Sequence, residues 1–431
     1  MTAVVSRVPS SRQAATRPAE DPRTSRRWAN AEALTCALVL LSLGVRFYLP
    51  SQIALGFLLM LVTAPAWLGV LRCYRFANLL AAIILTSIVF GIGLTTYSLA
   101  SRYVTRTSLV SEVTLVLLTF GGAGVVLWGR ERLGSRATAV LFAVGLLAGA
   151  ALHGHSATQN GWKGAWAIPV TTLLLALTYR RLLASLVVVA GLAIVCVVND
   201  TRALASVLVV SMLLLVWQLR APAPRARTSF AWTGMTMGVL GVLAYYLGQA
   251  ALVRGLLGAQ AQARSIQQID QAGSLILGGR PEITATAALI AAHPWGYGFG
   301  VAPRNSDVLI AKTGMARINY DPNNGYVDRF MFGSGFELHS VLGDIWVRMG
   351  PLGLLLLAVV VVVLVASLAR RLGARHANGL VLFLVLWAFW NMLFSPLLSA
   401  ALPLTLAIGM ALLRVDDPPL ESRHADLDAA S

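Results

Sequence analysis

The chain has 431 residues, of which 57% are hydrophobic and only 12% are charged, and its mean hydropathy is +0.73. This composition excludes an ordinary soluble domain and predicts an integral membrane protein that crosses the bilayer many times. The formal net charge of +16 does not indicate nucleic-acid binding, because the arginines are scattered over short loops rather than gathered on one soluble face. Membrane topology and contact with anionic lipid explain them better.

The first 32 residues are rich in Ser, Pro, Ala and Arg and are predicted to form a disordered, basic cytoplasmic tail. Twelve apolar segments follow, each near the length of about 20 residues that crosses a hydrocarbon layer of ~30 Å. Pro65 and Pro169 interrupt the second and sixth segments, which predicts helices that are kinked or partly buried in protein. The predicted spans are 33–49, 52–70, 77–99, 108–128, 137–152, 165–179, 182–198, 203–219, 231–250, 350–369, 378–395 and 397–414.

Basic residues orient these spans, because Lys and Arg near span ends are retained on the cytoplasmic side. Alternate loops are strongly basic, and an even number of spans with both termini cytoplasmic satisfies that alternation. The long polar insertion between the ninth and tenth spans is then extracytoplasmic. We therefore expect an all-α polytopic membrane protein with one large, partly helical outer loop. Its parts are the tail 1–32, helices 1–9 in 33–250, the loop 251–349, helices 10–12 in 350–414, and a cytoplasmic tail at 415–431.

Two arginines on the outer side are candidate anion ligands. Arg202 lies in the short connection between two apolar spans, where a guanidinium is expected to have an anionic partner. That partner is either a ligand, a lipid phosphate or the neighbouring Asp200. Arg280 precedes Pro281 and a predicted helix at 283–292, so backbone N–H groups, the helix dipole and a guanidinium converge there on an anion. The alternative for Arg280 is an ordinary capped helix.

His339 is the candidate general base. It opens a helical stretch that enters the tenth span, so it lies at the outer membrane boundary, and histidine suits proton transfer at neutral pH. A capping or interfacial histidine is the alternative. Glu282, Glu337 and Asp344 are possible supporting residues that orient the arginines or the histidine, or bind sugar hydroxyls.

No metal site and no cofactor are predicted. His153 and His155 have no nearby carboxylate to complete a ligand set, and the Asp–Leu–Asp sequence at 426–428 lies in the cytoplasmic tail. The sequence has no phosphate-binding loop of the Gly–x4–Gly–Lys–Ser/Thr type. Within the insertion, 256–275 predicts a helix on the membrane surface, and 319–336 predicts a mobile loop that covers bound sugar.

The order of these motifs resembles that of the O-antigen ligase and polymerase family of bacterial membrane glycosyltransferases. Thr–Arg starts a span, Gly–Arg precedes a helix closing with His–Pro–x–Gly–x–Gly–x–Gly, and His–Ser is followed by Gly–x–x–Gly. The resemblance implies that Arg202 and Arg280 bind a lipid-linked diphosphate and that His339 is the catalytic base in a periplasmic loop. Ser340 replaces the Asn common in the family, which leaves the hydrogen bonding of that neighbour in doubt.

The resemblance and the single large loop favour an O-antigen ligase of the bacterial inner membrane. Such an enzyme transfers a polysaccharide from undecaprenyl diphosphate to the lipid A core in lipopolysaccharide biosynthesis. The transfer is inverting and needs neither metal nor nucleotide. The expected partners are the undecaprenyl-diphosphate-linked glycan, the lipid A core oligosaccharide acceptor and membrane lipids. The alternatives are an O-antigen polymerase that joins repeat units and, in a different class, a transporter of an anionic or lipid-linked saccharide.

Overall fold

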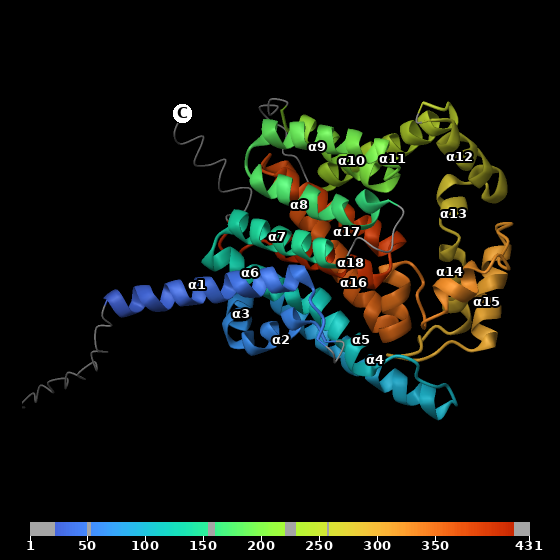
Figure 1. Ribbon diagram of the computed structural model, residues 1–431, viewed down its shortest axis with the longest axis horizontal. Coiled ribbons are helices and arrows are strands. Elements are labelled where there is room, and N and C mark those ends of the chain that lie inside the picture. The colour runs from blue at the N-terminus through green and yellow to red at the C-terminus, as the bar shows by residue number, and fades with distance from the viewer. Residues whose placement is uncertain (1–21, 50–52, 154–159, 220–229, 257, 418–431) are drawn as a thin grey trace, which may run out of the picture.

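The computed structural model describes residues 22–49, 53–153, 160–219, 230–256 and 258–417, and regular structure in these ranges is helical (Figure 1). Strand pairing in the same ranges is limited to isolated bridges. The all-α prediction is therefore confirmed for this part of the chain. The α-helices are α1 (Pro22–Val45), α2 (Leu55–Val62), α3 (Ala64–Val70), α4 (Ala77–Ala100), α5 (Leu109–Val116), α6 (Gly122–Arg132), α7 (Ser135–His153), α8 (Ala167–Leu177), α9 (Leu182–Val198), α10 (Arg202–Leu219), α11 (Phe230–Val253), α12 (Ala259–Ala272), α13 (Leu275–Gly279), α14 (Glu282–Ala292), α15 (Asn305–Ala316), α16 (Val341–Gly373), α17 (Gly379–Phe394) and α18 (Leu397–Ala411). Short tighter or wider turns are η1 (Leu71–Cys73), η2 (Leu117–Gly121), η3 (Trp162–Trp166) and η4 (Val327–Met331).

Each of the twelve predicted apolar segments falls on helical structure, but some segments cover more than one helical element and the helices differ in length. In the described ranges, five helical stretches are long and apolar enough to cross a membrane: α4, Leu109–Arg132, Ser135–Leu152, α10 and α16. The pair Leu55–Val62 and Ala64–Cys73 makes a sixth if it is one span, and it is bent by 70° near Pro65. The kink predicted there is confirmed.

The outer surface of the bundle is apolar. Leu85, Val187 and Val362 are among the large hydrophobic side chains that remain exposed on the helices of the bundle. A water-soluble bundle would bury most of these side chains, whereas a lipid environment leaves them in a favourable medium. The chain is therefore a helical protein with membrane-embedded character.

α4 and α16 approach each other closely, and this contact supports the site. A Cβ atom added to Gly91 of α4 would lie only 2.5 Å from the backbone oxygen of Arg348 in α16. Glycine therefore permits the two backbones to touch, as small residues commonly do between membrane helices. α16 itself is broken at Gly350, where the backbone φ is 55°, and Pro351 follows this glycine.

The residues 259–340, here called the outer lobe, form an arc beside the bundle that includes α12 to α15 (Figure 1). The lobe has its own hydrophobic cluster, in which Leu289 of α14, Met315 of α15 and Met331 of η4 are fully buried. Trp346 of α16 joins the same cluster. Thus α16 starts at Val341, ahead of the predicted span at 350–369, and its first part belongs to the packing of the lobe.

Candidate functional site

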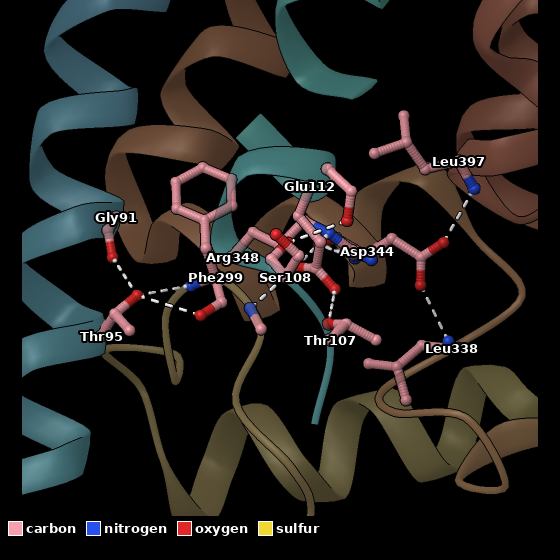
Figure 2. A network of polar contacts seen from close by, with 12 residues as sticks. Gly91, Thr95, Thr107, Ser108, Glu112, Phe299, Leu338, Asp344, Arg348 and Leu397 are labelled. Carbon is pink, nitrogen blue, oxygen red and sulfur yellow. Dashed lines mark hydrogen bonds and ion pairs between the residues drawn. The ribbon is translucent and has the colours of Figure 1, made fainter. Parts of the chain in front are cut away.

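A polar network anchors the lobe to the bundle, and sequence reasoning did not foresee its partners. Figure 2 shows the carboxylate of Glu112 in α5 facing the guanidinium of Arg348, with Nε 3.2 Å from Oε2. Glu112 Oε2 also accepts a hydrogen bond of 2.9 Å from the backbone N–H of Gly300. Thr95 of α4 accepts another, of 2.8 Å, from the backbone N–H of Phe299. The glycine-rich turn after α14 is therefore fixed to α4 and α5.

Asp344 holds the segment that carries His339. Its side chain is only 2% exposed, and its two oxygens accept hydrogen bonds of 2.8 Å from the backbone N–H groups of Leu338 and Leu397 (Figure 2). Ser340 caps α16 by accepting a bond of 3.0 Å from Gly343 N–H. Asp344, which was predicted as a supporting residue, thus braces the backbone next to His339 against the start of α18.

The geometry of His339 defines which ring nitrogen is available. Its backbone has a φ of 52°, a left-handed conformation that costs a non-glycine residue about 1–2 kcal/mol and that the neighbouring contacts must hold. Nδ1 lies 3.1 Å from the backbone oxygen of Glu337. Because a carbonyl oxygen can only accept, Nδ1 carries the proton in this contact. A neutral ring then presents the lone pair of Nε2, which is the form required of a general base.

Tyr326 brings two of the predicted residues, Glu282 and His339, together. Its hydroxyl group donates to Oε1 of Glu282, at the start of α14, and its ring lies 5.7 Å from the His339 ring at an angle of 33°. Burial raises the pKa of the Tyr326 phenol and the Glu282 carboxylate raises it further, whereas the nearby positive charge of Arg280 opposes both. The phenol therefore stays neutral and remains a hydrogen-bond donor. Glu282 and His339 thus both contact Tyr326, the residue just before η4, and Arg280 lies two residues before Glu282 in the chain.

Arg280 contacts an aromatic ring, and Glu282 keeps one carboxylate oxygen without a hydrogen-bond partner among the described residues. The guanidinium carbon of Arg280 lies 5.9 Å from the centre of the Trp390 ring in α17, which is a cation–π contact. Glu282 is 6% exposed, and its Oε2 has no hydrogen-bond partner among the described residues. A buried carboxylate oxygen that accepts no hydrogen bond favours binding of a cation or of a hydroxyl group.

Arg202 forms an ion pair that is separate from the contacts around Tyr326. Its Nε is 3.1 Å from Oδ1 of Asp200, and the other oxygen of that carboxylate is 3.7 Å from a guanidinium nitrogen of Arg264 in α12. The predicted alternative, an ion pair with Asp200, is thus present. α12 also carries Gln268, whose side chain lies 3.4 Å from the position of a Cβ on Gly279, next to Arg280. One helix of the lobe therefore contacts the surroundings of both arginines.

Glu337 supports the loop rather than facing the group around Tyr326. Its Oε1 accepts a hydrogen bond of 2.6 Å from the hydroxyl of Ser334, and its backbone N–H donates to the oxygen of Met331 at 2.8 Å. Its contribution to His339 is the backbone oxygen described above. In the described part of the chain, no group of three His, Cys, Asp or Glu side chains is placed to hold a metal ion. The side chain of His153, the whole of His155, and 426–428 lie outside that part.

Sequence reasoning missed Tyr326, Trp390 and the Glu112–Arg348 pair. Tyr326 and Trp390 belong to segments rich in aromatic residues, so nothing local distinguishes them from packing residues. Glu112 offered a usable signal, because a carboxylate inside an apolar segment is expected to have a cationic partner. The identity of that partner, far away in sequence, was not available from any spacing rule.

Comparison of the chain with protein-family models, with curated proteins and with solved structures finds no match. The family resemblance of the motifs therefore remains a prediction, and the site is interpreted from its own geometry.

Proposed function

We propose that this protein is a membrane glycosyltransferase of the O-antigen ligase type. It would transfer a polysaccharide from undecaprenyl diphosphate to a sugar of the lipid A core. The observation that carries the proposal is the contact of both His339 and Glu282 with Tyr326, with the guanidinium-bearing Arg280 two residues before Glu282 in the chain. Acyl or metal-dependent chemistry would need a nucleophile or a ligand set, whereas glycosyl transfer to a hydroxyl needs a base and a cation for the departing phosphate.

The transfer is a single displacement in this proposal. Nε2 of His339 takes the proton of the acceptor hydroxyl group while the oxygen of that hydroxyl attacks the anomeric carbon of the donor sugar. The bond between that carbon and the diphosphate oxygen breaks, and its electron pair leaves on the diphosphate. Attack opposite the leaving group inverts the anomeric centre. Arg280 stabilises the charge that builds on the leaving oxygen, and the diphosphate serves as leaving group without a nucleotide.

Arg202 is proposed as a second ligand of the diphosphate. Its ion pair with Asp200 is partly exposed, and exposed pairs contribute only about 0–1 kcal/mol. A doubly charged diphosphate, which accepts bidentate hydrogen bonds from guanidinium groups, would displace that carboxylate. The proposal thus treats the Asp200 pair as a contact that substrate replaces.

The finer topology also belongs to the proposal. All twelve apolar helices are taken as spans, with both termini in the cytoplasm of a bacterium, the outer lobe at the periplasmic face and the protein in the inner membrane. The basic alternate loops of the sequence support this orientation. The shorter apolar helices, such as α9 and α17, span either by local thinning of the bilayer or by packing against longer neighbours.

Glycan transfer in proteoliposomes tests the proposal. Purified protein is mixed with undecaprenyl-diphosphate O-antigen and lipid A core, without nucleotide or added metal. We expect transfer by the wild type, a loss of about 10²–10⁴-fold for His339→Ala and of about 10²–10³-fold for Arg280→Ala. A loss is also expected for Arg202→Ala. Arg317→Ala is the matched control, because this exposed arginine lies on the same lobe.

The outcomes separate the alternatives. Chain extension of the donor in place of transfer to the core would make the protein a polymerase. If the folded wild type transfers no sugar to either acceptor, the transferase proposal is refuted and the transporter becomes the favoured function. Full activity of folded His339→Ala would refute the assigned base.

A further inference from the structure

The outer lobe contains a hollow of about 800 Å³ directly beside the proposed catalytic group. Its volume lies within the range of roughly 300–1,000 Å³ that is usual for ligand sites. The side chains around it come from η4 and the segment before it, and they are those of Tyr320, Asn324, Tyr326, Asp328, Arg329 and Phe330. We call it the η4 hollow.

The aromatic part of the η4 hollow offers open ring faces. Phe330 is 54% exposed, and its ring centre lies 5.7 Å from that of Tyr326 at an angle of 36°. Exposed aromatic rings on a polar loop are costly in water, and they bind the apolar C–H faces of sugar rings.

The polar part is ordered by contacts within the lobe. Asn324 donates a hydrogen bond of 2.9 Å to the hydroxyl of Tyr320 and accepts one of 3.0 Å from the backbone N–H of Tyr326. Asp328 is held by an ion pair of 2.7 Å with Lys312 of α15. These groups are donors and acceptors at fixed positions, which suits the vicinal hydroxyls of a sugar better than a hydrocarbon chain.

We infer that the η4 hollow binds a sugar chain of one of the two glycan substrates, by stacking on Tyr320, Tyr326 and Phe330 and by hydrogen bonds to Asn324, Asp328 and Arg329. The inference rests on the proposed function for the identity of those glycans. Tyr326 is shared by the hollow and by the group around His339. A sugar bound in the hollow therefore lies next to the base. The chain is either the donor polysaccharide or the core acceptor.

A lipid surface is the competing occupant of an exposed phenylalanine. The charges of Asp328 and Arg329, both exposed at the same hollow, oppose burial in lipid because they would have to lose their water. The observations thus favour sugar.

Binding of lipid-free sugars by the full chain in detergent micelles tests the inference without any transfer step. Delipidated O-antigen chain and free core oligosaccharide are titrated separately, and binding is followed by calorimetry. Phe330→Ala and Tyr320→Ala are expected to weaken binding of one or both sugars about tenfold. Tyr97→Ala and Phe47→Ala, which remove exposed aromatic rings elsewhere, are the matched controls and are expected to bind as the wild type does. Unchanged thermal unfolding of all four variants excludes misfolding.

Each outcome decides one point. Weakening in one titration names that sugar as the occupant, and weakening in both assigns both glycans to the hollow. Wild-type binding by the folded hollow variants, or the absence of sugar binding in the wild type, overturns the inference. Sugar binding that persists in His339→Ala, or without any transfer, supports the hollow even where the proposed function fails.

Discussion

Removal of the Asp344 carboxylate is expected to loosen the segment that carries His339. In the structure this carboxylate is the acceptor for two backbone N–H groups, those of Leu338 and Leu397, both at 2.8 Å. Each buried donor that loses its acceptor costs about 1–3 kcal/mol. Asp344→Ala should therefore lower the free energy of unfolding by about 2–6 kcal/mol. Asp344→Asn keeps one acceptor oxygen and should lose about half as much.

Unfolding in mixed detergent micelles, followed by tryptophan fluorescence, measures this difference. Asp270→Ala is the matched control, since Asp270 is an exposed carboxylate on α12 and its removal should change stability by less than about 0.5 kcal/mol. Transfer activity should fall in both Asp344 variants, because His339 is held in its left-handed conformation by the adjacent contacts. If Asp344→Ala unfolds as the control does, the reasoning that this carboxylate braces the loop is wrong.

Three further predictions concern the anchoring pair, a buried phenol and the anion site. Arg348→Met should destabilise the protein by about 3–5 kcal/mol because it leaves Glu112 partly buried without its cation; a detergent unfolding curve equal to that of the wild type would contradict this. Burial raises the pKa of the Tyr297 phenol above its unfolded value of about 10. The stability that the neutral phenol contributes is complete below the unfolded pKa and is lost as the pH rises through the folded pKa. Tyr297→Phe should therefore flatten the alkaline decline of the unfolding midpoint, measured from about pH 9 to 12, and an unchanged slope would count against it. Asp200→Asn frees Arg202 and should tighten binding of farnesyl diphosphate by at most about fivefold, measured by calorimetry, whereas weaker binding would show that this carboxylate belongs to the site.

The sequence by itself determined the apolar helices of this protein and two helices of the lobe, whereas α13 and α15 were not predicted. Hydrophobic runs form helices because a backbone in an apolar environment must satisfy its own hydrogen bonds. The predicted segment 182–198 is α9, the predicted surface helix at 256–275 contains α12, and the predicted helix at 283–292 is α14 with one additional residue. Proline chemistry is equally local, so the bend near Pro65 followed from the sequence as well. The number of membrane spans was also a sequence-based prediction, and it stays one.

Only the tertiary structure decided how the candidate residues are grouped. Glu282 and His339 were proposed one at a time, and Tyr326 is the residue that joins them. Long-range pairing of this kind depends on how the lobe packs on α16, and no periodicity along the chain encodes it. Arg202 shows the same limit. The local sequence did not decide whether its partner is Asp200 or a ligand, and in the folded structure Arg202 pairs with Asp200. Helix formation follows from nearest neighbours and solvent, whereas a site is a meeting of distant segments that only packing brings together.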